Sequence, residues 1–212
     1  MKAYQVVIFD LDGVIVDTAK YHYRAWKQLA YRLGFEFTEE DNERLKGVSR
    51  MDSLEILLEI GNQQELFTES EKEEMAAEKN GRYVESLESL SPSDILPGVL
   101  DTIVCLKDKG SRIALGSASK NAVRILTQLD ILHLFDEIVD GNCVEKAKPD
   151  PEVFLIAAEK TGVRPENCLV FEDAYAGIEA AKRAGMDVIG IGTRRVLANA
   201  PRVVSDLREL EV

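Results

Sequence analysis

A short apolar run near the start of the chain constrains the fold more than any other feature of the sequence. Residues 5–9 (QVVIF) include four consecutive apolar positions, and the run stops at Asp10. A strand without alternating polar and apolar side chains is buried on both faces, which is typical of parallel sheets. Gly13 then permits a tight turn. The sequence therefore predicts a central parallel strand followed by an acidic loop.

Strand and helix patterns alternate through the second part of the chain. Further strands are expected at residues 112–116, 168–171 and 187–191, with a weaker one at 137–139. Helical patterns lie around them at 98–109, 121–129, 151–161 and 176–184. This alternation indicates βαβ units with right-handed crossovers. The expected fold class is α/β, with a Rossmann-like parallel sheet as its core.

Residues 16–91 break the alternation, because they contain helical patterns and no convincing strand. Helices are expected at residues 19–33, 38–45, 51–60 and 71–90. We predict an α/β core made of residues 1–15 and 92–212, with an all-helical cap of residues 16–91 inserted after the first strand. The two junctions, at about 13–17 and 91–98, are rich in turn-forming residues.

Charge and composition argue against several classes of protein. A formal net charge of −12 over 212 residues argues against a nucleic-acid interface, yet a few convergent basic groups can still hold a small anion. No apolar run approaches the roughly 20 residues of a membrane helix. Cys105, Cys143 and Cys168 fit neither a metal site nor a closed disulfide framework. We expect a reduced, cytoplasmic monomer that acts on a small molecule, without nucleic acid or membrane as partner.

Polar side chains gather at the carboxyl ends of the predicted strands, where open α/β sheets bind their ligands. These residues are Asp10, Asp12, Ser117, Ser119, Lys120, Asn121, Lys148, Glu172 and Asp173. Four carboxylates at one edge repel one another unless a cation is present. Hard oxygen ligands of this kind suit Mg²⁺, which keeps several waters and bridges substrate phosphates.

The same edge could transfer a phosphoryl group. Asp10 could attack phosphorus, as carboxylates do in aspartyl-phosphate enzymes. Asp12, two residues on, could protonate the leaving oxygen and deprotonate the incoming one. Ser117 and Lys148 could hold the phosphoryl oxygens. Each of these motifs is weak evidence for phosphoryl transfer when taken alone. Together they are stronger evidence, because they occur in order at the ends of successive strands.

Four ordered motifs carry a resemblance to a known family. Asp10-Leu11-Asp12-Gly13, Ser117, Lys148 and Glu172-Asp173 resemble the motifs of the haloacid dehalogenase superfamily, and the helical insertion resembles its C1-type cap. The resemblance spans nearly the whole chain. It implies the haloacid dehalogenase fold, Asp10 as nucleophile and Asp12 as general acid/base. It also implies Mg²⁺ bound by Asp10, Glu172, Asp173 and the backbone carbonyl of Asp12.

Segments of the cap resemble the sugar-phosphate mutases of that superfamily. Those enzymes interconvert β-glucose 1-phosphate and glucose 6-phosphate through a phospho-aspartate, with β-glucose 1,6-bisphosphate as activating intermediate. The resemblance implies catalytic roles for Thr18 and His22 beside Asp10, Asp12, Ser117 and Lys148. It implies substrate binding by Trp26, Lys46, Gly47, Val48, Ser49, Arg50, Ser53, Lys79, Ser117, Ala118, Ser119, Lys120, Asn121 and Lys148.

Plainer structural roles remain open for four of these cap residues. Thr18, His22 and Trp26 share one helix face at i, i+4 and i+8. Thr18 could simply cap the helix, and Trp26 could pack in a core. His22 could be structural, or it could hydrogen-bond to the hinge or to Asp12 and so link protonation to closure. Arg50 is either an exposed residue at a helix start or the ligand of a second phosphate.

Other activities also remain open. A sugar-phosphate phosphatase on the same scaffold would share the Asp10 intermediate and use water as acceptor. A dehalogenase would have little use for Asp12 or for a metal at Glu172-Asp173. A phosphonate hydrolase would need a cap lysine, for which Lys46 and Lys79 are available. A catalytically silent binding protein would form no phosphoenzyme.

Overall fold

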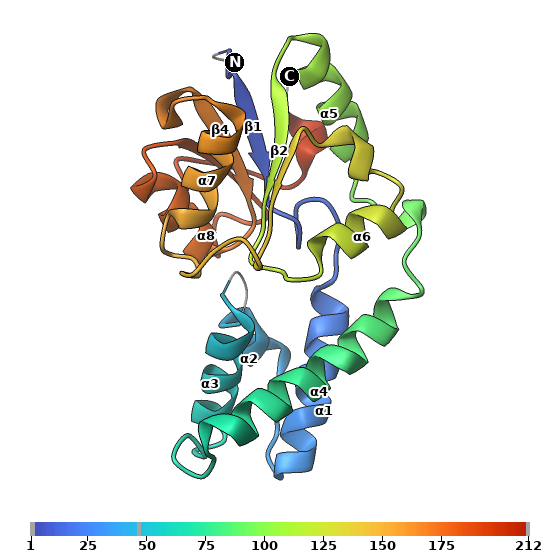
Figure 1. Cartoon of the computed structure of the whole chain (residues 1–212), viewed down its shortest axis with the longest axis vertical. Coiled ribbons are helices and arrows are strands. Elements are labelled where there is room, and N and C mark those ends of the chain that lie inside the picture. The colour runs from blue at the N-terminus through green and yellow to red at the C-terminus, as the bar shows by residue number, and fades with distance from the viewer. Residues whose placement is uncertain (1–2, 46–47, 211–212) are drawn as a thin grey trace.

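The structure is a computed structural model that describes residues 3–45 and 48–210. Figure 1 shows a sheet flanked by helices at one end and a block of helices at the other. Lys46 and Gly47, both expected to contact substrate, lie outside the described residues.

Six parallel strands form one sheet in the order β3-β2-β1-β4-β5-β6. Their bounds are β1 Val6–Phe9, β2 Arg112–Gly116, β3 Glu137–Val139, β4 Cys168–Glu172, β5 Asp187–Ile191 and β6 Arg202–Val204. The predicted α/β fold class is confirmed. The sequence did not predict β6, which is three residues long and lies at the edge of the sheet.

The apolar run of β1 is buried on both sides of the sheet, as its pattern predicted. Val7 and Phe9 belong to one hydrophobic cluster, whereas Val6 and Ile8 belong to another. Helices α5 (Val99–Asp108) and α6 (Ala122–Gln128) pack into the first cluster, and α7 (Glu152–Thr161) and α8 (Tyr175–Arg183) into the second. Four short 3₁₀ turns complete this body, η1 Pro92–Asp94, η2 Leu132–Leu134, η3 Pro165–Asn167 and η4 Leu207–Glu209.

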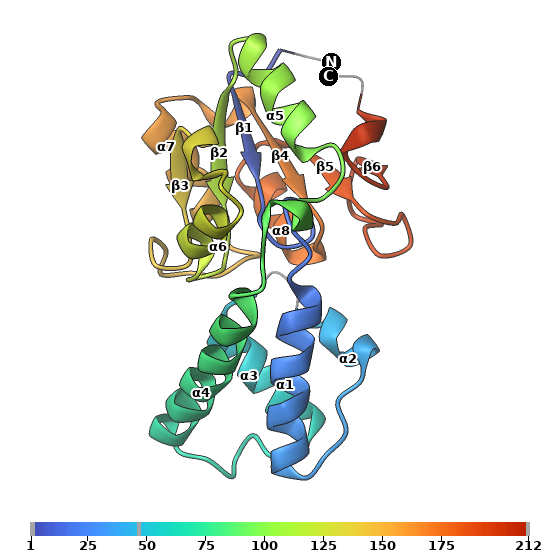
Figure 2. The same cartoon turned by 90° about the vertical axis from the view of Figure 1, so that its right-hand side faces the viewer.

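The segment that we expected to be a cap folds into four helices with a hydrophobic cluster of its own. The helices are α1 Ala19–Leu33, α2 Glu39–Glu43, α3 Arg50–Ile60 and α4 Glu69–Leu87. Figure 2 shows α1 and α4 side by side, joined to the sheet by two connections. Helix α4 begins two residues before the predicted start, because Thr68 and Glu71 form a capping box there. We call this segment the helical block, and the predicted domain boundaries stay a prediction.

The two connections between sheet and block are hydrogen-bonded to each other. The backbone N–H of Leu96 donates to the carbonyl of Ile15 at 2.9 Å, and Val16 forms an antiparallel bridge with Ile95. On the outgoing side, the N–H of Gly13 donates to the carbonyl of Val16 at 2.9 Å, and Gly13 has a φ of 80° that favours glycine. The outgoing and returning chains therefore form one paired hinge.

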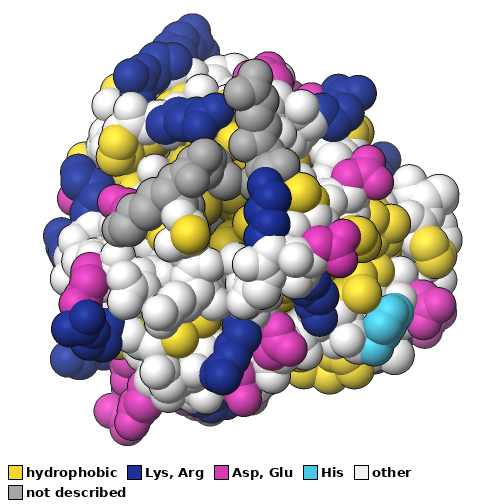
Figure 3. Space-filling model, turned by 90° about the horizontal axis from the view of Figure 1, so that it is seen from above, with side chains coloured by type: hydrophobic (Ala, Val, Ile, Leu, Met, Phe, Trp, Pro, Cys, Tyr) yellow, Lys and Arg dark blue, Asp and Glu magenta, His cyan; other side chains and the backbone are white. Residues whose placement is uncertain are grey.

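Figure 3 looks onto the end of the sheet body that faces away from the helical block. Basic and acidic side chains are interspersed there with apolar ones, and neither sign of charge gathers in one place. Every helix among the described residues is too short or too polar to span a membrane.

Candidate active site

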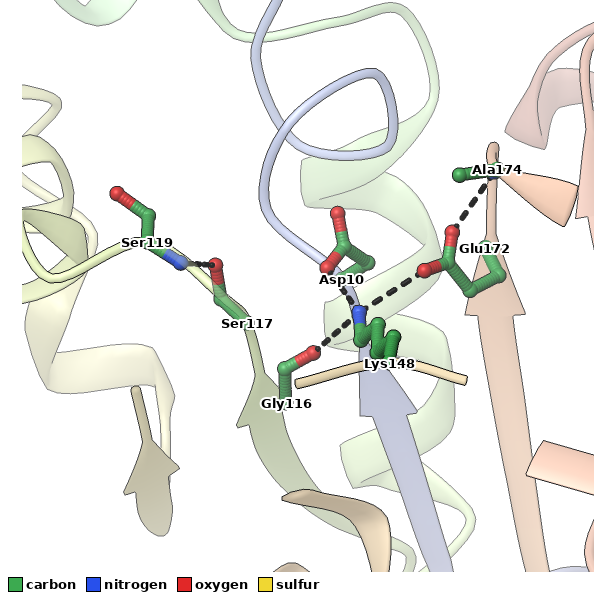
Figure 4. Close-up of polar contacts among 7 residues, drawn as sticks. All are labelled: Asp10, Gly116, Ser117, Ser119, Lys148, Glu172 and Ala174. Carbon is green, nitrogen blue, oxygen red and sulfur yellow. Dashed lines mark hydrogen bonds and ion pairs between the residues drawn. The ribbon is translucent and has the colours of Figure 1, made fainter. Parts of the chain in front are cut away.

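Lys148 binds two carboxylates from neighbouring strands at the centre of the sheet edge. Its Nζ lies 2.6 Å from Asp10 Oδ1, 2.9 Å from Glu172 Oε1 and 3.1 Å from the carbonyl oxygen of Gly116. Figure 4 shows these contacts converging from β1, β2 and β4, with the second oxygen of Asp10 pointing away from Lys148. Asp10, Lys148 and Glu172 are all buried. One ammonium thus faces two carboxylates, which leaves the cluster net negative.

Burial governs the titration of this cluster. Burial raises the pKa of Asp10 to about 8, with Glu172 and Asp12 adding to the effect and Lys148 opposing it. Burial disfavours the ammonium of Lys148, but Asp10 and Glu172 outweigh it and hold the Lys148 pKa above its usual range. Lys148 is therefore charged, and the excess negative charge favours a further cation or proton at Asp10.

Three carboxylates of this edge fit a metal ion. One oxygen each from Asp10, Glu172 and Asp173 lies within 4.8 Å of the others. Both oxygens of Glu172 already accept hydrogen bonds, from Lys148 and from the N–H of Ala174 at 2.9 Å, but each oxygen retains a second lone pair. The set of hard oxygen donors suits a small divalent cation. The expected contribution of the Asp12 backbone carbonyl stays a prediction.

Two glycines make room for the carboxylates of this cluster. A Cβ atom on Gly13 would overlap the carboxylate of Asp173, and one on Gly177 would overlap that of Glu172. Any other residue at either position would push the carboxylate out of the cluster. The chain is thus shaped around the positions of these two acidic side chains, which supports a site built for a ligand.

Ser117 begins a turn of hydroxyl groups after β2. Its N–H donates to the carbonyl of Val139 at 2.9 Å, and its Oγ accepts from the N–H of Ser119 at 3.1 Å. The Oγ of Ser119 in turn accepts from the N–H of Asn121 at 3.2 Å. These bonds fix the turn against β3 while the Ser117 hydroxyl hydrogen stays available to a ligand.

Asp12 is half-buried and is held by Thr18. The hydroxyl of Thr18 donates to Asp12 Oδ1. Thr18 occupies the N-cap position of α1, as one of the two roles considered for it predicted, although its side chain forms no capping hydrogen bond. Its backbone is in the αR region, with φ −95° and ψ −3°, rather than in the extended region of a residue that caps with its side chain. Burial raises the pKa of Asp12 to about 7, opposed by Lys148 and Lys79.

His22 interacts with Lys79 and not with Asp12. His22 Nδ1 lies 2.7 Å from Lys79 Nζ, which also lies 4.5 Å from the centre of the Trp26 ring. Burial lowers the pKa of Lys79 to about 7 and holds the pKa of His22 well below its usual range. Neutral imidazole can accept from the lysine, so His22 orients Lys79, and the alternative in which the His22 side chain hydrogen-bonds to Asp12 is not observed.

A cavity of about 420 Å³ lies between the sheet edge and the helical block. Sixteen of the predicted site residues line it: Asp10, Asp12, His22, Trp26, Val48, Ser49, Arg50, Ser53, Lys79, Ser117, Ala118, Ser119, Lys120, Asn121, Lys148 and Asp173. Thr18 and Glu172 lie behind this surface and contact it through Asp12 and Lys148. The cavity therefore brings together most of the residues expected to bind substrate.

Arg50 faces the cavity from the block. It is the first residue of α3, it is half-buried, and burial lowers its pKa. Across residues 3–45 and 48–210, the Arg50 guanidinium forms no salt bridge. The Ser53 hydroxyl donates to the carbonyl of Ser49 at 2.8 Å, so it supports the start of α3. Arg50 is thus free to bind an anion.

Two further asparagines belong to the site. Asn121 Nδ2 donates to Asn80 Oδ1 at 3.0 Å, which joins the sheet body to α4 across the cavity. Asn42, buried in α2, lines the same cavity. Sequence reasoning did not assign either residue. Asn80 follows Lys79 directly, which is a signal that could have found it, whereas nothing in the sequence marks Asn42.

Comparison with known proteins places the chain in a family. A family model described as haloacid dehalogenase-like hydrolase matches residues 4–185. The chain belongs to the haloacid dehalogenase-like hydrolase family. It is 44% identical over 206 residues to a β-phosphoglucomutase of Bacillus subtilis, a match that covers 97% of this chain and 91% of that protein. It is 36% identical to a phosphorylated carbohydrates phosphatase of Thermotoga maritima, a match that covers 87% of this chain and 83% of that protein.

A solved structure agrees with this placement in the haloacid dehalogenase-like family. The crystal structure of a β-phosphoglucomutase from Clostridium difficile matches with a TM-score of 0.95 and 44% identity. The match covers 98% of this chain and 93% of that one, so it includes the helical block as well as the sheet. The resemblance inferred from the four motifs is thereby confirmed.

Proposed function

We propose that this chain is a β-phosphoglucomutase, which interconverts β-D-glucose 1-phosphate and D-glucose 6-phosphate through phospho-Asp10 and β-glucose 1,6-bisphosphate. The observation that carries the proposal is a single cavity with anion-binding groups at both ends. Lys148 and Ser117 lie beside Asp10 on the sheet body, and Arg50 faces them from the block. A sugar that carries a phosphate at each end needs two sets of anion-binding groups, one for each phosphate. The 44% identity to the Bacillus enzyme supports the same activity.

Asp10 is the proposed nucleophile. Lys148 binds Asp10 Oδ1 and leaves the other oxygen free to attack phosphorus. The new bond joins that oxygen to phosphorus, and the bond from phosphorus to the sugar oxygen breaks, which gives phospho-Asp10 and a free sugar hydroxyl. Lys148 and the Ser117 hydroxyl then stabilise the charge on the equatorial phosphoryl oxygens.

Asp12 is the proposed general acid/base. As phospho-Asp10 passes its phosphoryl group to the 6-hydroxyl of β-glucose 1-phosphate, Asp12 takes the proton of that hydroxyl. The resulting bisphosphate turns over, Asp10 attacks the phosphate on C1, and Asp12 returns the proton to the departing O1. A pKa of about 7 makes both protonation states accessible near neutral pH.

Mg²⁺ is the proposed cofactor, held by Asp10, Glu172 and Asp173 together with the Asp12 carbonyl. When bound, it would neutralise charge on the phosphoryl oxygens and on the three carboxylates. The close approach of these carboxylates and the glycine cradles around two of them support this assignment. The substrate-binding residues are those that line the cavity, with Lys46 and Gly47 retained as proposals. We propose a cytoplasmic monomer.

The deciding experiment follows two products at once. The protein is incubated with β-glucose 1-phosphate, Mg²⁺ and a trace of β-glucose 1,6-bisphosphate, while glucose 6-phosphate and free phosphate are measured. We expect fast formation of glucose 6-phosphate with little free phosphate, and no turnover by Asp10→Asn. Asp108→Asn, an exposed change on α5, is the control and should behave as wild type. Free phosphate without glucose 6-phosphate would instead indicate a sugar-phosphate phosphatase.

A further inference from the structure

The hydroxyl of Tyr83 is buried with no hydrogen-bond partner. Tyr83 is 0% exposed, and among the described residues its oxygen is one of two buried side-chain atoms that lack a partner. A buried polar group left without a hydrogen bond costs about 1–3 kcal/mol. Such a group calls for an explanation, and a role in another state of the protein is one. The Tyr83 hydroxyl therefore needs an acceptor that lies within its reach.

Tyr83 packs against the polar cluster beside Asp12. It lies one turn after Lys79 on α4, and its ring centre is 3.9 Å from that of His22. Lys79 Nζ lies 4.9 Å from the centre of the Tyr83 ring. The rest of the ring is covered by the hydrophobic cluster that spans the hinge. The ring therefore has a fixed place, and only the hydroxyl lacks an interaction.

Thr18 offers an acceptor for the Tyr83 hydroxyl. Burial raises the pKa of Tyr83 and Asp12 adds to the effect, whereas the nearby Thr18 hydroxyl opposes it. The geometry of the Tyr83 hydroxyl falls short of a hydrogen bond. The Thr18 hydroxyl gives its one hydrogen to Asp12 and keeps lone pairs that can accept another. The Tyr83 hydroxyl is neutral, so it can donate a hydrogen bond to Thr18 Oγ1.

We propose that Tyr83 is a positioning residue for Asp12. When the helical block closes on a sugar phosphate, the Tyr83 hydroxyl donates to Thr18 Oγ1, and Thr18 donates to Asp12. The chain of two hydrogen bonds fixes the carboxyl of Asp12 in line with the substrate hydroxyl. The inference rests on the proposed function, because it assigns a role to Tyr83 through the proton transfer at Asp12.

The location of these residues explains why closure would complete the chain. Thr18 begins α1 directly after the hinge, whereas Tyr83 lies on α4, which returns to the hinge from the other side. Thr18 lies at the hinge itself, so rotation of the block changes the backbone torsions beside Thr18 and its position relative to Tyr83, while Asp12 stays with the sheet body. Closure of this kind commonly completes a catalytic site. The missing hydrogen bond of the Tyr83 hydroxyl then destabilises the present state, and closure would supply it.

The test compares Tyr83→Phe with Tyr21→Phe, a control on α1 whose hydroxyl lies 3.4 Å from Ser89 Oγ. We expect Tyr83→Phe to lower kcat at least tenfold with KM changed less than twofold. Its melting temperature should be equal to or above that of wild type, because a buried unpaired hydroxyl is removed. Phosphorylation of Asp10 by acetyl phosphate should stay within twofold, because acetate departs without a proton. Tyr21→Phe should keep wild-type kcat.

A double variant separates positioning from packing. If Tyr83 acts through Thr18, adding Tyr83→Phe to Thr18→Val should lower kcat no further than Thr18→Val alone. Unchanged kcat in Tyr83→Phe, additive losses, or a loss of kcat that parallels a fall in melting temperature would overturn the proposal. The proposed function is judged separately, by the product that wild type forms. If wild type releases only phosphate, the ratio of variant to wild type is measured on that product, since Asp12 still protonates the leaving oxygen.

Discussion

Lys148 Nζ lies 2.6 Å from Asp10 Oδ1 and joins the carboxylates of two adjacent strands, β1 and β4, through a single ammonium group. The proposed nucleophile, Asp10, is therefore held by a charge that comes from outside the sheet, in the loop before α7. Because all three groups are buried, the arrangement is stable only while the positive charge is present. Lys148 thus links the stability of the core to the chemistry of the site.

Replacing Lys148 by Met should lower the free energy of unfolding by about 3 kcal/mol, because two buried carboxylates lose their partner. Mild acid or added Mg²⁺ should restore part of this loss, by neutralising the same carboxylates. The measurement is denaturant unfolding at several pH values, with and without Mg²⁺. Lys146→Met, in the same loop, is the control, since Lys146 is exposed and lies 4.0 Å from Asp150. Equal losses in the two variants would contradict the argument.

Gly177→Ala should weaken metal binding although alanine favours a helix. A Cβ at this position overlaps the Glu172 carboxylate, so Glu172 must leave its place beside Lys148 and Asp173. We expect the Mg²⁺ concentration for half-maximal activity to rise at least tenfold. Gly81→Ala, in α4 with open space around it, should leave the Mg²⁺ requirement unchanged and raise stability by up to about 1 kcal/mol. A normal Mg²⁺ requirement in Gly177→Ala would show that Glu172 is not a ligand.

The sequence predicted the sheet and its acidic edge well because both depend on local patterns. A run of apolar residues that ends in Asp10 predicts a buried strand, and parallel strands bring their carboxyl ends together. Asp10, Ser117 and Glu172 are therefore adjacent in space although they are far apart in the chain. Strand β6 was missed because three residues, Arg202–Val204, carry too short a pattern to recognise.

Contacts between helices could not be predicted from the same patterns. Helix periodicity places Thr18 and His22 on one face of α1, but it does not say which residues of α4 oppose them. The pairing of His22 with Lys79 depends on how α1 and α4 pack. The buried hydroxyl of Tyr83 follows from the same packing. The hydrogen bond from Thr18 to Asp12 could not be predicted either, because the sequence does not show that the turn after β1 brings Asp12 beside the start of α1.

Arg50→Ala should separate the two halves of the reaction. Phosphorylation of Asp10 by acetyl phosphate needs only the sheet body, so its rate should change less than threefold. Mutase turnover should fall about 10- to 100-fold, because a charged hydrogen bond worth about 1.5–3 kcal/mol is lost at the second phosphate. The control is Arg44→Ala, whose side chain pairs with Glu59 at 3.1 Å on the surface of the block. Similar losses in both assays would rule out a separate phosphate site at Arg50.

Lys79 should make stability depend on pH above neutrality. Burial, with Arg50 acting in the same direction, lowers its pKa from the ordinary lysine value of 10.5 to about 7. Between these values the unfolded chain holds a proton that the folded chain has lost. The free energy of unfolding therefore gains a contribution that rises with pH from about 7 to 10.5, by at most about 1.4 kcal/mol per pH unit.

Lys79→Met should remove this contribution, so that the free energy of unfolding rises less steeply with pH than in wild type. The measurement is denaturant unfolding at intervals from about pH 7 to 10, the range between the two pKa values. Lys72→Met is the matched control on the same helix, because Lys72 is paired with Glu55 at 2.8 Å and stays protonated across this range. If Lys79→Met and wild type show parallel pH profiles, Lys79 stays charged above neutrality in the folded chain. It would then meet the sugar phosphate as a full cation, and its contact with His22 Nδ1 would be a charged hydrogen bond.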